Sequence, residues 1–207
     1  MAKMTRFLSS LFAALVAFAL AWGFAPKSAT THPHVFIDAR ATYLFDDQGR
    51  LSAIRQVWAF DDFFSVMLID EFDEDQSGDF SQQELVRLRE EAFNPVEEFS
   101  YFTHVDINGE LVPVAGISTF GASIIRDQVV YSFTADLPEA VDPRLSAVSV
   151  GLYDPSYYID VALAEQDPNR SEGKMPACRF EIGEDSLNPI YFGTVFPTVT
   201  RLDCPAG

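Results

Sequence analysis

Apolar and polar residues alternate along the segment that follows residue 34. Every second residue from Val35 to Phe45 is apolar, and polar residues such as Asp38 stand between them. A period of two residues is typical of a strand with one buried face and one solvated face. Turn-forming residues at 46–49 separate this strand from a second apolar run, Leu51–Phe60, so the pattern predicts a β-hairpin.

The apolar spacing changes to three and four residues after Asp61, which can serve as a helix N-cap. A first helical pattern ends near Phe72, and a second begins at Gln82. The second pattern stops before Pro95, because proline cannot continue a helix. We therefore expect a helix-loop-helix element inserted at residues 61–94.

The remainder of the chain has mostly strand-like patterns. The predicted strands cover residues 99–107, 111–114, 117–125, 128–135, 146–153, 157–164 and 178–182. Asn108-Gly109 is a strong hairpin signal between the first two, and the polar stretch 165–176 is expected to be a loop. These patterns predict an α+β fold, in which one antiparallel β-rich, sandwich-like domain at 32–207 carries the helix-loop-helix insertion.

The first 21 residues have the layout of a secretory signal peptide. Two basic residues, Lys3 and Arg6, precede an almost wholly apolar run at 7–20. Small residues place a cleavage site after Ala21, and cleavage as late as residue 31 stays open. The alternative is an uncleaved anchor, for which the apolar run is near the lower limit of about 18 residues. We expect cleavage, export and no stable membrane insertion afterwards.

The composition is strongly acidic, with a formal net charge of −17. Removal of residues 1–21 takes away two basic and no acidic residues, so the mature chain carries −19. Such a field repels phosphate backbones and attracts cations, and we therefore expect no nucleic-acid partner. Acidity also serves solubility alone, and 48% hydrophobic residues leave ample material for a core.

The chain has two cysteines, Cys178 and Cys204. In an oxidising compartment such a pair most simply forms a disulfide. A thiolate metal site is the alternative, and it needs more soft ligands than two cysteines provide.

An acidic segment of twelve residues, Asp73 to Glu84, connects the two predicted helices and resembles the calcium loop of the EF-hand family over its whole length, with one departure. Calcium requires about seven oxygens around a tight turn, and Gly78 permits the left-handed bend. The expected ligands are the side chains of Asp73, Asp75, Ser77 and Glu84 and the carbonyl of Asp79. Ser77 stands where Asp or Asn is usual, so one fewer charge predicts weaker binding.

The alternative for this loop is an acidic, solvated helix-turn-helix that binds nothing. EF-hands commonly work in pairs, and one such loop is present in the sequence, so we expect a structural clamp rather than a calcium-triggered switch. A weak site, with a Kd on the order of 10⁻⁴ to 10⁻³ M, stays filled where exported proteins meet calcium.

Three histidines occur, at His32, His34 and His104. Residues two apart in an extended chain face the same way, so His32 and His34 can approach one ion. His104, with Asp38 or Glu110 as a carboxylate, would complete a site suited to zinc, nickel or cobalt. The alternative is that these histidines belong to a flexible surface segment without a metal.

The segment His32-Pro33-His34-Val35-Phe36-Ile37-Asp38 resembles the opening motif of the periplasmic proteins of domain of unknown function family 1007. Tyr101-Phe102-Thr103 with Asn108-Gly109, and the later Tyr153-Asp154-Pro155-Ser156-Tyr157-Tyr158, are similar to that family too. The resemblance implies a periplasmic location and a link with an inner-membrane transporter of nickel, cobalt or zinc. It supplies no catalytic residues.

Two classes of function follow from these patterns. The first is a metal-binding or accessory protein of a transition-metal transport system, with calcium as a structural ion. The second is a calcium-stabilised exported adhesion or assembly module, in which the histidines are incidental. The sequence lacks a nucleophile elbow, a phosphate loop, a zinc-protease motif and paired redox cysteines, so we do not expect an enzyme.

Overall fold

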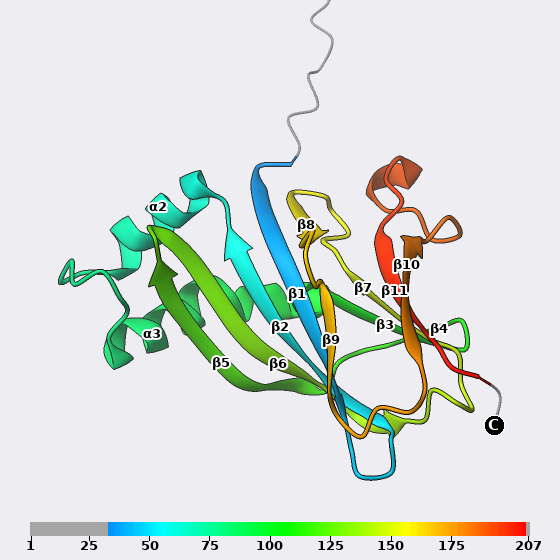
Figure 1. Ribbon diagram of the computed structural model, residues 1–207. Helices are drawn as coiled ribbons and strands as arrows, with labels where there is room; N and C mark the ends of the chain where they lie inside the picture. Colours follow the sequence, from blue (N-terminus) through cyan, green and yellow to red (C-terminus); the bar gives the residue numbers. More distant parts are fainter. Residues whose placement is uncertain (1–32, 206–207) are drawn as a thin grey trace, which may run out of the picture. The chain divides into compact units, whose positions relative to one another are not determined.

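The computed structural model describes residues 33–205, so the predicted signal peptide and His32 lie outside the described residues (Figure 1). The strands are β1 (Val35–Phe45), β2 (Leu51–Phe60), β3 (Thr103–Ile107), β4 (Glu110–Val112), β5 (Gly116–Ile125), β6 (Gln128–Val141), β7 (Val148–Leu152), β8 (Ile159–Leu163), β9 (Asn169–Gly173), β10 (Arg179–Glu184) and β11 (Thr198–Asp203). The α-helices are α2 (Asp62–Phe72) and α3 (Gln82–Leu88). Shorter segments are a π-helical turn at Arg89–Phe93 and 3₁₀ segments at Asn94–Phe102 and Tyr191–Gly193.

The strands form two sheets. The first has the order β5-β6-β2-β1-β8, with β9 also paired to β1, and the second has the order β10-β11-β7-β3-β4. Buried side chains of both sheets belong to one hydrophobic cluster, among them Trp58 on β2 and Val105 on β3. The expected β-rich, sandwich-like domain is therefore confirmed. In Figure 1, α2 and α3 lie beside β5 and β6 of the first sheet.

The predicted hairpin of β1 and β2 is confirmed, and it is antiparallel. The other edge of β1 departs from the mainly antiparallel arrangement that the sequence predicted. There β8 pairs in parallel along Val35 to Ala39, and β9 pairs in parallel along Ala41 to Phe45. The chain reaches this edge from β7 in the second sheet, and a local pattern of side chains carries no information on the direction of such a crossover.

Two predicted boundaries are corrected between residues 82 and 107. The second helix ends at Leu88, and the chain continues through the π-helical turn to Phe93. Residues 99–102, expected in a strand, belong to the 3₁₀ segment, where Ser100, Tyr101 and Phe102 have positive φ angles. This unusual backbone buries the rings of Tyr101 and Phe102.

Two strands of the C-terminal part were not predicted. β9 lies within the polar stretch that was expected to be a loop, and most of its side chains are exposed. β11 pairs with both β10 and β7 in the centre of the second sheet. Edge position explains the polar composition of β9, because an edge strand needs backbone pairing but no buried side chains.

Aromatic rings fill the space between the sheets. The ring of Trp58 stacks on Phe102 with centroids 5.7 Å apart and meets Phe133 edge-on at 4.7 Å. The buried side chain of Gln56 accepts a hydrogen bond from the Trp58 indole N–H at 2.9 Å and donates one to the Thr103 hydroxyl at 2.6 Å. Since Gln56 is on β2 and Thr103 on β3, this satisfied polar pair joins the two sheets.

The predicted disulfide between Cys178 and Cys204 is confirmed. It joins the residue before β10 to the residue after β11, next to the paired residues Arg179 and Asp203. The bond therefore closes the open end of an antiparallel strand pair. None of the helices in residues 33–205 is long and apolar enough to cross a membrane.

Candidate metal centre

Three carboxylates converge in the connection between α2 and α3. Asp73, Asp75 and Glu84 each offer an oxygen, and these oxygens lie within 4.8 Å of one another. Asp73 and Glu84 are buried, whereas Asp75 is exposed. In the described part of the chain this is the one group of three or more acidic, histidine or cysteine side chains with such spacing. Carboxylate oxygens are the ligands that calcium prefers.

Backbone N–H groups of the connection hold these carboxylates in place. The two oxygens of Asp73 accept hydrogen bonds from the N–H groups of Ser77 at 2.9 Å and Gly78 at 3.0 Å. Glu84 accepts from the N–H of Glu74 at 2.7 Å through one oxygen and from Ser81 at 2.8 Å through the other. The turn thus wraps around the acidic side chains and directs them to its interior.

The loop closes because two residues adopt left-handed backbone angles. Gln76 has φ of 55° and Gly78 has φ of 83°. The Ser77 hydroxyl donates to the carbonyl of Asp79 at 2.9 Å, so these two predicted ligand oxygens are neighbours. The Asp79 carboxylate is exposed and accepts from the N–H of Phe80 at 2.9 Å. Glycine adopts a positive φ angle without strain, whereas most other residues would be strained at the position of Gly78.

Glu84 also belongs to the start of α3. Ser81 is the N-cap, and its side chain and that of Glu84 form a reciprocal capping box. Hydrogen bonds from Ser81, first from its side chain and then from its backbone, lower the pKa of Glu84. The carboxylate therefore stays ionised near neutral pH, as a cation ligand must.

A basic side chain beside the loop, that of Arg87, pairs with Glu74 and not with the three carboxylates. Arg87 forms an ion pair with Glu74, donates to the carbonyl of Glu71, and lies over the ring of Phe72 at 4.9 Å. Within residues 33–205, no lysine, arginine or histidine forms an ion pair with Asp73, Asp75 or Glu84. Three carboxylates therefore lie together without a cationic side chain paired to them, an arrangement in which a bound cation would offset their mutual repulsion.

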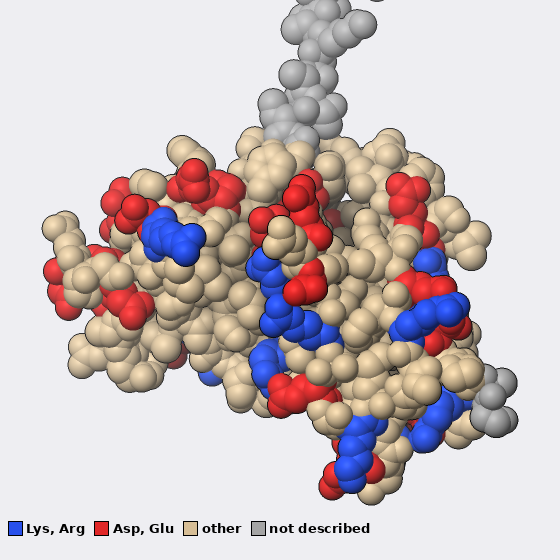
Figure 2. Space-filling view, viewed as in Figure 1, with Lys and Arg blue, Asp and Glu red and all other residues tan. Residues whose placement is uncertain are grey.

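The helices anchor the loop to the first sheet. The side chain of Asp61 caps α2 by accepting from the N–H of Phe64 at 2.9 Å, as the sequence predicted. The buried Ser65 hydroxyl accepts from the N–H of Val129 on β6 at 3.0 Å. Phe72 at the end of α2 is buried in the core cluster. Figure 2 shows acidic side chains gathered at the end of the molecule where Figure 1 places the α2–α3 connection.

The two described histidines lie on different sheets. His34 precedes β1, its N–H donates to the carbonyl of Tyr158 at 2.9 Å, and its ring is 4.9 Å from the Tyr158 ring. His104 lies on β3, and its ring stacks on Tyr153 at 3.9 Å. Among residues 33–205, neither histidine belongs to a group of three potential ligands, and neither Asp38 nor Glu110 joins them in one. The predicted site around His32 stays a prediction.

His104 has its Nε2 atom 2.9 Å from the carbonyl oxygen of Tyr153. A carbonyl only accepts, so Nε2 carries the proton and Nδ1 is the atom left to act as an acceptor. Burial lowers the pKa of His104, although the Tyr153 carbonyl and Asp154 act in the opposite direction. The imidazole is therefore neutral at pH 7 and is held in one tautomer.

A buried acid to which the sequence analysis gave no role organises the turn between β7 and β8. Asp154 is 4% exposed, and its carboxylate accepts from the N–H groups of Ser156 at 2.8 Å, Tyr158 at 3.0 Å and Ile159 at 3.0 Å. The Asp-Pro-Ser sequence was the available signal, since aspartate often caps the backbone of a tight turn. This turn carries the chain from β7 in one sheet to β8 in the other.

Comparison with known proteins gives two matches. Residues 16–191 match the family described as "Protein of unknown function (DUF1007)". A protein described as "Uncharacterized 15.5 kDa protein in trpE 3'region", from Spirochaeta aurantia, is 26% identical over 92 residues, which cover 44% of this chain and 65% of that protein. The chain thus aligns with slightly less than two thirds of that relative. Because the family match covers most of the sequence, the chain belongs to the DUF1007 family of proteins of unknown function.

Proposed function

We propose that this protein is an exported calcium-binding protein, in which residues 73–84 form an EF-hand-type site between α2 and α3. The observation that carries the proposal is the approach of three carboxylate oxygens to within 4.8 Å in a loop where no basic side chain is paired with them. The spacing of the acids and the position of Gly78 agree with the twelve-residue pattern of such loops.

The ligand set fits calcium better than a transition metal. Asp73, Asp75, Ser77 and Glu84 would supply side-chain oxygens, and Asp79 would supply its carbonyl. A bidentate Glu84 brings this set to six oxygens, and a water near Ser81 would bring it to about seven. The set contains neither sulfur nor imidazole, the ligands that zinc, nickel and cobalt favour.

The ion would act as a structural clamp. It would bridge the end of α2, where Asp73 lies, and the first turn of α3, where Glu84 lies. Compensating the mutual repulsion of the carboxylates should stabilise the helix-loop-helix against local unfolding. Titration calorimetry of calcium into the mature protein tests this directly, and one binding event that is lost in Asp73→Asn supports the proposal. Absence of calcium binding to the parent refutes it.

We further propose that the protein serves a nickel, cobalt or zinc transport system as a periplasmic accessory protein. The support is the resemblance of residues 32–38 to the family's opening motif, together with a disulfide that favours an oxidising compartment. His32 and His34 would contact the transported ion, while the hydrogen bond of His104 to Tyr153 leaves it only Nδ1 for such a role.

Zinc and nickel titrations into calcium-saturated protein separate this role from that of an exported adhesion or assembly module. The parent should bind one transition-metal ion, and a His32→Ala, His34→Ala double variant should bind it at least about tenfold more weakly, because neutral imidazole is the expected ligand. His104→Ala tests whether the third histidine takes part. Equal binding by parent and double variant would favour the adhesion or assembly module.

A further inference from the structure

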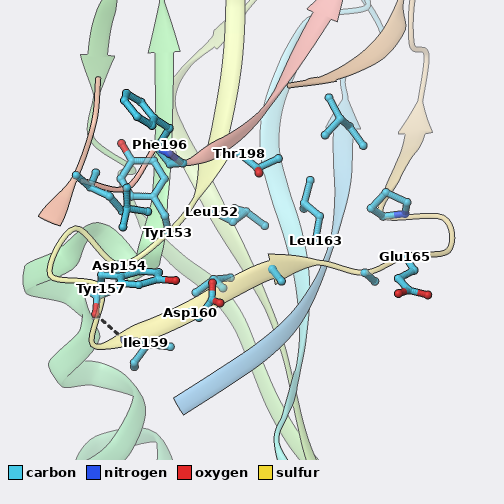
Figure 3. A pocket seen from close by; sticks show the side chains of 18 residues that line it. Leu152, Tyr153, Asp154, Tyr157, Ile159, Asp160, Leu163, Glu165, Phe196 and Thr198 are labelled. Atoms are coloured by element: carbon cyan, nitrogen blue, oxygen red, sulfur yellow. Dashed lines mark hydrogen bonds between the residues drawn. The ribbon is translucent and has the colours of Figure 1, made fainter. Parts of the chain in front are cut away.

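A cleft of about 500 Å³ opens where the edges of the two sheets meet (Figure 3). β8 forms one side, and Phe196 and Thr198 of the segment that enters β11 face it from the other. Tyr157 of the turn between β7 and β8 lies at one end. The volume is in the range of functional binding sites, and the cleft is separate from the calcium loop.

The outer edge of β8 lines this cleft with its backbone. The carbonyl of Tyr158 and the N–H of Ala164 bond to β1, so residues with even numbers direct their backbone groups toward β1. The odd-numbered residues direct their N–H and C=O groups away from β1, because successive residues of a strand point these groups to opposite sides. Asp154 caps the N–H of Ile159 on this outer side. The backbone groups of Val161 and Leu163 therefore face the cleft.

In the described part of the chain β8 is an edge strand of the first sheet, and no strand pairs with its outer edge. Such an edge presents donors and acceptors at a repeat of two residues, about 6.6 Å. This repeat matches the backbone of an extended peptide, which is the ligand that adds to sheet edges in known recognition modes. The five residues of β8 give an edge about 16 Å long.

The charge of the lining selects the kind of peptide. The side chains around the cleft include Asp154, Asp160 and Glu165 but no lysine or arginine. The Asp154 carboxylate is occupied by the turn, whereas the Asp160 carboxylate forms no ion pair or hydrogen bond with the described residues. Partial burial raises the pKa of Asp160. Figure 2 shows acidic side chains at the position of β8 and basic ones lower along β1 and β9, but the lining of the cleft itself is acidic, so a positively charged partner matches it.

We propose that the β8 edge binds an extended, lysine- or arginine-bearing segment of another exported or envelope protein. The segment pairs its backbone with Val161 and Leu163 and places a basic side chain against Asp160. Its apolar side chains contact Tyr157 and Phe196 across the cleft. Main-chain pairing supplies general affinity, and the acidic lining supplies selectivity for basic segments.

The test uses the mature, calcium-saturated protein and fluorescence anisotropy of three labelled probes. The first is an eight-residue peptide of alternating lysine and valine, and the second has glutamate in place of lysine. The third keeps lysine and valine but carries a methyl group on every backbone nitrogen. We expect saturable binding of the first with a Kd below about 1 mM. The other two should bind at least about tenfold more weakly, because they lack the matching charge or the hydrogen-bond donors.

Chain variants locate the site. Val161→Pro removes an outward N–H without touching the bonds to β1, and an edge position tolerates proline. It should abolish binding of the lysine peptide. Asp160→Asn should weaken that binding about fivefold, as expected for one partly exposed ion pair. Glu139→Gln is the matched control, since it removes one exposed negative charge on β6 and should leave binding unchanged.

Three outcomes would overturn the inference. Equal binding of the methylated and unmethylated lysine peptides would show that backbone pairing plays no part and that surface charge alone attracts the peptide. Absence of binding to the parent would exclude the edge as a peptide site. Self-association of the parent that Val161→Pro abolishes, without peptide binding, would assign the edge to a second copy of the chain. Circular dichroism of each variant checks that the fold is retained, and the probe comparison on the parent does not depend on any variant.

Discussion

Substitution of Glu84 by glutamine is the sharpest test of the calcium loop. The change keeps the size of the side chain and one oxygen, which can accept from the N–H of Glu74 or of Ser81 but not from both. It removes the charge and the second carboxylate oxygen that a bidentate ligand needs. The capping of α3 by Ser81 is retained in part, so the substitution acts mainly on the affinity for calcium.

The expected magnitude follows from mass action. A site with a Kd of 10⁻⁴ to 10⁻³ M in 10 mM calcium stabilises the folded state by about 1.4 to 2.7 kcal/mol. For a domain of this size, each kcal/mol raises Tm by about 2 to 4 °C, so calcium should raise the Tm of the parent by about 3 to 11 °C. Glu84→Gln should lose most of that increase.

The assay is differential scanning calorimetry in calcium and in a calcium chelator. Asp79→Asn is the matched control, because it removes one charge from the same loop while its ligating carbonyl remains. Its calcium response should equal that of the parent to within about 2 °C. Equal responses in the parent and Glu84→Gln would refute the ligand assignment, and a response lost equally in both variants would indicate a diffuse charge effect.

Three further predictions concern stability. Ser65→Ala should cost about 1 to 3 kcal/mol in denaturant unfolding, because it leaves the buried N–H of Val129 without its acceptor. Reduction of the Cys178–Cys204 disulfide should lower the free energy of unfolding by about 3 kcal/mol, because the unfolded chain gains conformational entropy. Denaturant unfolding with and without reductant measures this difference. Burial lowers the pKa of His104, so the unfolded state takes up a proton first. The associated stability is complete above about pH 6.5 and falls as pH drops below it, and His104→Gln should flatten this part of the profile.

The parts predicted from sequence are those whose determinants lie close together in the chain. The β1–β2 hairpin follows from alternation and an intervening turn, and Asp61 was recognised as a cap because its partner is three residues away. The convergence of three acidic side chains between α2 and α3 has the same origin, since they lie within twelve residues. The ordering of Asp73, Asp75 and Glu84 around one point is a local consequence of the turn.

The parts that were missed depend on distant residues. Residues 99–102 look like a strand because they are aromatic, and burial of Tyr101 and Phe102 in the core compensates the left-handed backbone there. β9 has polar side chains and is a strand through its pairing with β1. The cleft joins β8 to residues 195–198, more than 30 positions later, and no local pattern could have placed them together.

If residues 73–84 bind calcium as proposed, their position in the fold favours a clamp over a switch. Asp73 follows the end of α2 and Asp61 precedes its start, and the twelve residue steps between these positions span about 18 Å along the helix axis. At the far end Asp61 accepts from the N–H of Phe36 on β1, which pairs with β8, and between the two ends Ser65 fixes the helix to β6. A change at the loop must move this anchored helix before it reaches the cleft, so calcium should alter the stability of the α2–α3 element much more than the peptide affinity of β8. We therefore expect the peptide affinity of the protein to be the same with and without calcium. Each proposal can then be tested even if the other is refuted.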